Sequence, residues 1–320
     1  MTYKLLHALW YLLSLLPFRV LYGISDGLYL ILYYGLKYRR RVIWKNISES
    51  FPDKTPEEQE AIIRSFYHWL CDYFVETLKL MSLSPKTLKK RMVFTGIETL
   101  NAYSEAGRSC ALYLGHYGQW EWISSLPLWM SPKAVPLQVY HVLENPLFDR
   151  LMLHARQRQG AVSVPIAETL RRVASYNQQK QPIVIGYIAD QVPFWNNIHH
   201  WVDFLHHDTP VLTGSERIIK RMNEVPFYCE VSRVRRGYYR CDLKLMTEDP
   251  QHYPDYALTD QYFHLLEQNI LRDPALYLWS HNRWKRTREE YNLRYDEETG
   301  RVDLGPLEEI LARKQKATSL

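Results

Sequence analysis

A histidine and a glutamate that lie five positions apart, His116 and Glu121, have the residue types of a general base and its partner. They follow an apolar run at 110–114. On a regular helix five residues turn by about 500°, which leaves two such side chains roughly 140° apart. Gly115 and Gly118 instead permit a tight turn before the helix that is expected next. We therefore expect the imidazole to fold back onto the carboxylate.

A histidine paired in this way can take a proton from a hydroxyl group. The carboxylate fixes the tautomer of the ring and raises the basicity of the other ring nitrogen. That nitrogen can then activate the hydroxyl of an acceptor molecule, so the reaction needs no serine or cysteine nucleophile. The alternative is that His116 is a structural residue, hydrogen-bonded after its strand.

The segments around this pair indicate an α/β fold. An apolar run such as 110–114 is typical of a strand that is buried on both faces of a parallel sheet. Further strands are expected at 135–140, 161–164 and 183–188, with a helix at 166–177. A hairpin at 225–234 and 238–246 would extend the sheet, and later helices are expected at 258–271 and 306–316. The predicted fold class is α/β, with a mixed, largely parallel sheet flanked by helices.

Two polar residues, Asp190 and Gln191, come shortly after the apolar strand at 183–188. If this strand is parallel to the strand at 110–114, both residues emerge at the same sheet edge as His116, where α/β folds bind ligands. We therefore predict that they contribute to substrate binding. A helix cap is the alternative role for Asp190.

The segment at 144–151 leads into a helix expected at 154–160, which carries two arginines, Arg156 and Arg158, and ends at Gly160. Because these arginines are two positions apart, they point to different faces, and at most one should reach the site. A guanidinium there can hold a phosphate or stabilise an oxyanion. The alternative is a plain surface helix.

The N-terminal residues 5–36 are predominantly apolar and are interrupted by Pro17, Arg19 and Asp26. Neither half reaches the roughly 20 residues of a spanning helix. The halves could lie in the membrane interface, form a shallow hairpin or an imperfect span, or pack as a helix pair of a soluble protein. The cations that follow at 37–45 predict that the body of the protein faces the cytoplasm. The 24 tyrosines and 10 tryptophans also suit a membrane surface, although a large aromatic core would explain them equally.

Composition narrows the class of partner. The net charge of +5 favours anionic lipid headgroups or an acidic carrier protein, and we find no nucleic-acid motif. The four cysteines contain no C-x-x-C pair, which argues against a zinc knuckle or a disulfide framework. Histidines cluster at 199–207, but neighbouring side chains on a strand point opposite ways. We predict no metal or cofactor, and a metal-dependent hydrolase remains an alternative.

A capping box formed by Thr55 and Glu58, with Pro56 between them, predicts a long amphipathic helix that runs toward Leu83. The chain is accordingly divided into a membrane anchor at 1–36, a helical linker region at 37–90 and an α/β domain at 91–320. Near the C-terminus, the run WSHNRWK at 279–285 predicts a structural loop anchored by aromatic packing, with a membrane-facing rim as the other option.

Taken together, these features resemble the lysophospholipid-acyltransferase-like family that includes the late lipid A acyltransferases of Gram-negative bacteria, the lauroyl and myristoyl transferases. The resemblance covers nearly the whole chain. It rests on the apolar N-terminal segment, YRRRVIWKNI at 38–47, SFP at 50–52, the H-x4-E pair, Asn145-Pro146, the helix with Arg156 and Arg158, Asp190-Gln191, and the 279–285 run.

The resemblance implies a glycerol-3-phosphate-acyltransferase-like fold and an O-acyltransferase that forms no covalent acyl-enzyme. It implies that His116 is the base, that Glu121 is its partner and that Arg156 or Arg158 assists. The implied substrate-binding residues are Arg156, Arg158, Asp190, Gln191 and Asn145. The acyl donor would be a thioester of acyl carrier protein, or else of coenzyme A. The acceptor would be a phosphorylated glycolipid, a lipid A precursor, at the cytoplasmic face of the inner membrane.

Three departures from the family pattern leave the acceptor open. Gln119 replaces the usual Asn, Tyr140-His141-Val142 replaces a Tyr-Arg-Pro-like run, and histidines from 199 onward replace a Gly- and Phe-rich strand. The acceptor could instead be a lysophospholipid or an amino-acid lipid. A non-catalytic membrane scaffold is a further alternative, although the loss of His116 or Glu121 would have been its signature.

An acyl chain also sets a requirement on the site. Each CH₂ exposed to water costs about 0.8 kcal/mol of hydrophobic stabilisation. We therefore expect an apolar groove that runs from His116 toward the membrane and whose depth sets the chain length. Trp120 and Trp122 are the candidate lining residues.

Overall fold

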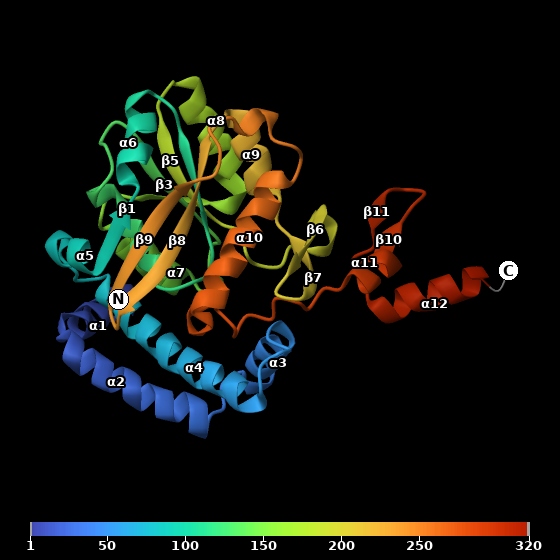
Figure 1. Ribbon diagram of the computed structural model, residues 1–320, viewed down its shortest axis with the longest axis horizontal. Coiled ribbons are helices and arrows are strands. Elements are labelled where there is room, and N and C mark those ends of the chain that lie inside the picture. Colours follow the sequence, from blue (N-terminus) through green and yellow to red (C-terminus); the bar gives the residue numbers. More distant parts are fainter. Residues whose placement is uncertain (1, 319–320) are drawn as a thin grey trace.

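The computed structural model describes residues 2–318, and its centre is a sheet of seven strands in the order β1-β9-β8-β2-β5-β3-β4 (Figure 1). The strands are β1 (Met92–Thr95), β2 (Cys110–Leu114), β3 (Val135–Tyr140), β4 (Val162–Pro165), β5 (Ile183–Ile188), β8 (Val225–Arg235) and β9 (Tyr238–Leu245). Strand β2 is parallel to β5 and β8, and β3 is parallel to β4 and β5. Strand β1 is parallel to β9, and within the seven-stranded sheet only the hairpin pair β8–β9 is antiparallel. The predicted fold class, a mixed and largely parallel α/β sheet, is confirmed.

The central strand β2 is buried along its whole length, as its apolar sequence predicts. Neighbouring strands flank it on both edges. Its Tyr113 ring stacks against Tyr262 of α10 (Ala257–Arg272) at a centroid distance of 4.8 Å, so α10 covers one face. Leu112 and Leu114 line a cavity on the other face. The strand thereby delivers His116 from a rigid interior position to the sheet edge.

The remaining helices connect or cover these strands. They are α5 (Pro85–Arg91), α6 (Ile97–Glu105), α7 (Pro146–Gln157), α8 (Thr169–Gln178), α9 (Gly214–Met222), α11 (Arg288–Arg294) and α12 (Leu307–Thr318). Short 3₁₀ helices occur at η2 (Trp120–Leu128), η3 (Ile166–Glu168), η4 (Trp195–Asn197), η5 (Pro250–His252) and η6 (Pro274–Leu276). Two small hairpins, β6 (His200–Phe204) with β7 (His207–Val211) and β10 (Tyr295–Asp296) with β11 (Arg301–Val302), project beside the main sheet (Figure 1). The helix expected at 166–177 begins as η3 and continues as α8.

The long helix α4 (Pro56–Lys79) has the predicted capping box, in which Thr55 and Glu58 exchange backbone and side-chain hydrogen bonds. It ends earlier than expected, at Lys79. After a turn at 80–84, Ser84 caps a further helix, α5, by accepting a hydrogen bond from the Thr87 amide. Helix α5 lies beyond the predicted helix and was not predicted. Helix α3 (Arg40–Ser50), which precedes α4, was not predicted individually.

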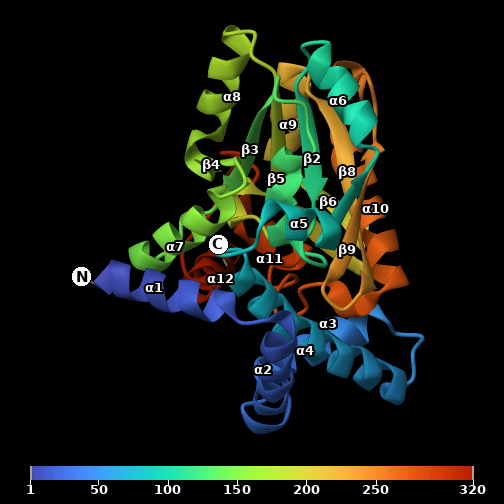
Figure 2. The same ribbon diagram turned by 90° about the vertical axis from the view of Figure 1, so that its left-hand side faces the viewer.

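The apolar N-terminus forms α1 (Thr2–Leu15) and α2 (Phe18–Leu30), and a π-helical turn, η1 (Ile31–Gly35), completes the second helix. They lie at the end of the molecule opposite α6 and α8 (Figure 2). Within residues 2–318 no single helix has the length and hydropathy needed to cross a membrane. The pair at 2–35 meets the criterion only when both helices are counted together, and the two are bent by 107°. The predicted break near Pro17 is confirmed.

One side of this helix pair belongs to the hydrophobic core. The Trp10 indole donates a hydrogen bond to the Leu78 carbonyl of α4 at 2.9 Å, and Leu21 is fully buried. Other apolar side chains on α1, including Leu5 and Leu12, are exposed. The division of the chain into segments at 36 and 90 remains a prediction.

Candidate active site

His116 and Asp190 follow two neighbouring parallel strands, and they meet at the carboxyl edge of the sheet. Leu114 at the end of β2 is in register with Ile188 at the end of β5. Two residues further on, His116 Nδ1 lies 2.6 Å from Asp190 Oδ1, and the His116 backbone N–H donates to Asp190 Oδ2 at 2.9 Å. Burial opposes ionisation of Asp190, but the positive charge and the hydrogen bonds of His116 outweigh it and lower the pKa of this carboxyl.

This contact determines which ring nitrogen can act as a base. An ionised carboxylate only accepts hydrogen bonds, so in the neutral form of His116 the proton lies on Nδ1 and Nε2 keeps its lone pair. The side-chain amide nitrogen of Gln191 lies 3.2 Å from Nε2 and is the donor at this position. Asp190 and Gln191 are therefore at the edge predicted for them. Their observed partner is the histidine itself, and neither caps a helix.

The expected contact between His116 and Glu121 is wrong. Both oxygens of Glu121 are bound by Arg156, through Nε to Oε2 and through Nη2 to Oε1, each at 2.6 Å. The chain turns at Gly118, which has a φ of +61°, and then enters η2, and within residues 2–318 no hydrogen bond joins the Glu121 carboxylate to the imidazole. The Trp120 ring lies edge-on to the His116 ring, with centroids 5.2 Å apart. Asp190, which is 74 residues distant in sequence, takes the orienting position.

Of the two arginines on α7, only Arg156 reaches the site, as predicted for one of them. Burial disfavours its charged form, but the adjacent Glu121 carboxylate raises the pKa of Arg156 above its usual value. Arg158 is exposed and donates to the Leu80 carbonyl at 3.0 Å. It thus fastens the end of α7 to the turn after α4, and it does not line the cavity at His116.

Asn145 has a structural role at the start of α7. Its side-chain oxygen accepts hydrogen bonds from the amides of Leu147 and Phe148 at 3.0 and 3.2 Å, which is the geometry of a helix N-cap. The residue does not line the cavity at His116. It positions the helix that carries Arg156, and its contact with substrate remains a prediction.

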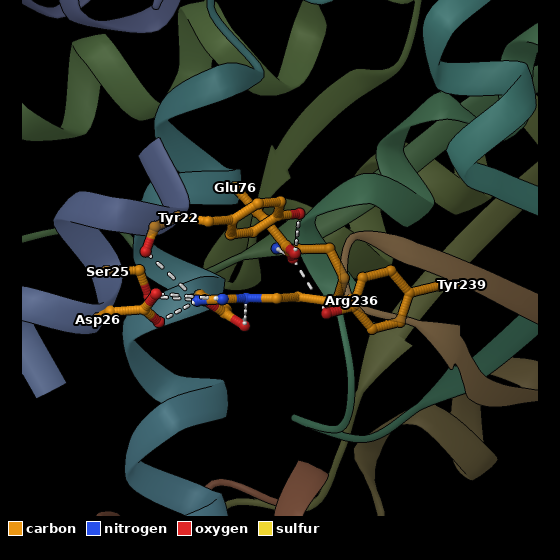
Figure 3. Close-up of polar contacts among 8 residues, drawn as sticks. Tyr22, Ser25, Asp26, Glu76, Arg236 and Tyr239 are labelled. Carbon is orange, nitrogen blue, oxygen red and sulfur yellow. Dashed lines mark hydrogen bonds and ion pairs between the residues drawn. The ribbon is translucent and has the colours of Figure 1, made fainter. Parts of the chain in front are cut away.

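A buried carboxylate on α4 braces the loop that follows His116. Glu76 is fully buried, and it accepts hydrogen bonds from the Gln119 amide at 2.9 Å and from the hydroxyls of Tyr22 and Tyr239 at 2.9 and 3.0 Å (Figure 3). The Trp122 indole donates to the Glu76 carbonyl at 3.1 Å. Burial outweighs these donors and raises the pKa of Glu76 to about 7. The sequence carried no signal for this residue, because its partners come from three distant segments.

An arginine beside Glu76 connects α2, α4 and the turn between β8 and β9. Arg236, in the turn between β8 and β9, binds Asp72 of α4 through Nε at 2.8 Å and Nη2 at 2.6 Å (Figure 3). Its Nη2 also lies 2.6 Å from an oxygen of Asp26 on α2. The Ser25 hydroxyl donates to Asp72. These contacts attach α2 to the α/β body with charged hydrogen bonds.

The loop expected at 279–285 is a structural element, as predicted. The Asn46 amide of α3 donates to the carbonyls of Trp279 and His281 at 2.8 and 2.9 Å. The Leu278 amide donates to the backbone carbonyl of His116 at 3.1 Å. Burial lowers the pKa of His281 to about 4, so its ring is neutral near pH 7. The loop holds the backbone of the base in place.

A cavity of about 870 Å³ opens at His116, within the roughly 300–1,000 Å³ typical of ligand pockets. Residues of β2, β5 and β3, such as Leu112, Gly186 and Pro136, form part of its lining. Residues of α8 and α9 also line it. The cavity therefore extends from the catalytic edge back along the strands, and most of its strand lining is apolar.

One expectation about the groove lining is corrected. Trp120 lines the cavity, but Trp122 does not, because its ring is fully buried and packs edge-on against Tyr239. None of the described residues of α1 or α2 lines the cavity. The expected direction of the groove, from His116 toward the membrane, remains a prediction.

The histidines at 199–207 do not converge on one point. His200 Nε2 lies 2.7 Å from Asp260, and His207 stacks on Trp284 with centroids 4.0 Å apart. Across residues 2–318, no group of three or more His, Cys, Asp or Glu side chains is arranged to hold a metal ion. The metal-dependent hydrolase therefore has no donor set in this part of the chain.

Comparison with known proteins agrees with this geometry. The sequence profile of the family described as bacterial lipid A biosynthesis acyltransferase matches residues 1–286. Two proteins of Haemophilus influenzae, both named lipid A biosynthesis acyltransferase, are 22% identical to the chain over 274 and 288 residues. The first alignment covers 84% of this chain and 82% of the relative, and the second covers 87% and 88%. The chain is an acyltransferase and belongs to the bacterial lipid A biosynthesis acyltransferase family.

Proposed function

We propose that this protein transfers a fatty acyl chain from a thioester of acyl carrier protein to a hydroxyl group of a lipid A precursor. The observation that supports it most directly is the His116–Asp190 pair at the opening of a long apolar cavity. A base beside an acyl-sized cavity is what a direct transfer to a hydroxyl requires. The two relatives named above are called lipid A biosynthesis acyltransferases, which supports lipid A as the acceptor.

In this mechanism the acceptor hydroxyl displaces the Gln191 amide and gives its proton to His116 Nε2. The oxygen then attacks the thioester carbonyl, and a tetrahedral oxyanion forms. Its collapse breaks the carbon–sulfur bond, and the proton on Nε2 passes to the leaving pantetheine thiolate. Asp190 stabilises the imidazolium between these steps through its hydrogen bond to Nδ1.

Arg156 is the residue proposed to stabilise the oxyanion. It lines the cavity together with His116, and its Nε and Nη2 are held by Glu121. No hydrogen bond within residues 2–318 engages its Nη1. We therefore propose that Glu121 orients Arg156 and neutralises its charge, and that it does not orient His116.

We further propose that the protein works at the cytoplasmic face of the inner membrane. Exposed apolar side chains on α1 and α2 support attachment to a lipid surface. The basic residues at 37–45 support a cytoplasmic orientation and suit an acidic carrier protein. A lysophospholipid or an amino-acid lipid remains the alternative acceptor. The scaffold alternative is not favoured, because a buried carboxylate still orients His116.

The test is mass spectrometry of lipid A from cells that contain the protein, lack it, or carry His116→Ala. The proposal expects one acyl chain fewer per lipid A molecule in the second and third strains. An unchanged lipid A with an altered phospholipid or amino-acid lipid profile would assign the other acceptor. Purified enzyme given matched acyl-carrier-protein and coenzyme A thioesters would identify the donor.

A further inference from the structure

A second cavity, of about 690 Å³, lies between the segment at 196–201 and the C-terminal segment at 288–304. Its walls come from the segment at 196–201 and from α11, β10 and β11. The family match ends at residue 286, so α11, β10 and β11 lie beyond it. This cavity therefore contains a wall that the shared part of the family does not supply.

The side chains that line this cavity are aromatic rings, hydrogen-bond donors and cations. The rings are Trp201, Tyr256, Tyr291 and Tyr295, and the polar groups are Asn196, Asn292, His199, Arg288 and Arg301. No Asp or Glu among the described residues lines it. Aromatic faces stack on the apolar faces of sugar rings, and arginines bind phosphate through charged hydrogen bonds. The lining therefore suits a sugar that carries a phosphate.

The rings are held in place by contacts with one another. Trp201 lies edge-on to Tyr291, and Tyr291 stacks on Tyr295, with centroids 5.9 Å apart in both pairs. The Arg288 guanidinium lies 4.6 Å from the centroid of Trp201 and forms an ion pair with Asp208, Nη2 to Oδ1, at 2.7 Å. The charge of Arg288 is thus already balanced by a carboxylate.

Arg301 differs from Arg288 in this respect. It is exposed at the cavity and forms no ion pair with any residue in 2–318. Its position on β11 is fixed by pairing with Asp296 of β10 in the backbone ladder. Arg301 is therefore the cation available to a phosphate group.

The two cavities share a wall. Asn197 lines the cavity at His116, whereas its neighbours Asn196 and Ile198 line the second cavity. The segment that connects Gln191 to this wall is short, and Arg286 supports it by donating to the Pro193 carbonyl at 2.7 Å. A molecule held in the second cavity would therefore lie one loop away from the acyl cavity.

We propose that the second cavity binds the phosphorylated saccharide headgroup of the acceptor, with Arg301 on the phosphate and Trp201 and Tyr295 against the sugar. This inference rests on the proposed function, because it assigns a site to the acceptor of that reaction. A free sugar phosphate has the same chemistry, so the experiment must separate the two sources.

The experiment uses the full chain in detergent and calorimetric titration with glucosamine phosphate, glucosamine and inorganic phosphate. Glucosamine phosphate should bind more tightly than either part alone. Arg301→Gln should weaken its binding by about tenfold, the effect of losing one charged hydrogen bond. The control Arg171→Gln, at an exposed arginine of α8, should leave binding unchanged. The assignment would be overturned if glucosamine phosphate bound equally to the wild type and to Arg301→Gln, or if it did not bind to the wild type. It would also be overturned if the wild type bound inorganic phosphate as tightly as glucosamine phosphate.

A second measurement separates this site from the acyl-transfer reaction. With vesicles containing a phosphorylated glycolipid, Arg301→Gln should raise the acceptor KM by about tenfold and leave kcat and the donor KM unchanged. An unchanged acceptor KM with weakened sugar-phosphate binding would assign the cavity to a free sugar phosphate and overturn the headgroup. If no lipid is acylated but Arg301→Gln still weakens binding, the cavity stands and the proposed function fails.

Discussion

Asp190 and His116 form a 2.6 Å contact across two neighbouring parallel strands, and in the neutral ring this contact leaves Nε2 as the nitrogen that can accept a proton. The acid of the H-x4-E pair, Glu121, binds Arg156 instead. The site thus contains a hydrogen-bonded pair that orients His116 and a separate ion pair that holds a cation at the cavity. Variants of the two pairs should therefore behave differently.

Asp190→Asn should reduce acyl transfer by about 10²–10⁴-fold, the range of a general-base contribution, because an amide can stabilise the wrong tautomer of His116. The measurement is kcat of the purified variant, with circular dichroism to show that it is folded. Glu121→Gln is the matched comparison. In a double-mutant cycle, the loss of kcat in Glu121→Gln combined with Arg156→Ala should differ from the sum of the two single losses, expressed as free energies. The losses of Asp190→Asn and Arg156→Ala should add. A Glu121 variant that couples to His116 and not to Arg156 would contradict this assignment.

The buried Glu76 should make stability depend on pH. Its pKa is raised from 4.5 to about 7, so the folded state holds a proton that the unfolded state has released in this interval. The stabilising contribution of protonated Glu76 to the free energy of unfolding is full below pH 4.5 and is lost as pH rises to about 7. The wild type should therefore lose about 3 kcal/mol of unfolding free energy between these two pH values, and Glu76→Gln should not show this loss.

Urea unfolding of both proteins at pH 5 and pH 7.5 measures this difference. Glu98→Gln, at an exposed position on α6, is the control and should behave as the wild type. A wild type and a Glu76→Gln variant with parallel pH dependences would show that Glu76 titrates alike in the folded and unfolded states.

Gly186→Val should shorten the preferred acyl chain without abolishing transfer. Gly186 lines the cavity, and a Cβ placed there would lie 3.3 Å from Leu114 Cδ1, so added carbon atoms must occupy cavity space. The measurement is competition among acyl donors of increasing length. Ala102→Val, on the exposed side of α6, adds volume elsewhere and should leave the profile unchanged. The same profile in both variants would mean that chain length is measured outside this cavity.

Replacing Leu5, Leu9 and Leu12 together by serine should weaken attachment to membranes. These residues share one face of α1 and are 70%, 52% and 62% exposed, so the substitutions remove apolar contact with lipid and little of the core. Co-sedimentation with anionic vesicles should fall by more than about tenfold. Leu271→Ser, at a leucine of α10 that is 53% exposed, provides the control. The melting temperature of the triple variant shows whether it is folded. If the folded triple variant sediments with vesicles as the wild type does, the membrane attachment lies elsewhere in the chain.

The sequence by itself determined the elements and the type of sheet. Apolar runs at 110–114 and 183–188 predict buried parallel strands because only such strands exclude polar residues from both faces. The capping box of Thr55 and Glu58 locates a helix start because these residues bind backbone amides only three positions away. Asp190 and His116 were placed at one edge for the same reason, since parallel strands end together.

Only the tertiary structure decided which side chains pair. Glu121 is five positions from His116 and still misses it, because the turn at Gly118 and the 3₁₀ helix η2 direct it toward α7. Asp190 contacts His116 from 74 residues away because their strands lie in register. Glu76 accepts hydrogen bonds from α2, from β9 and from Gln119 in the loop after His116. Spacing along the chain reports local geometry, whereas a hydrogen bond within 3 Å depends on how whole elements pack.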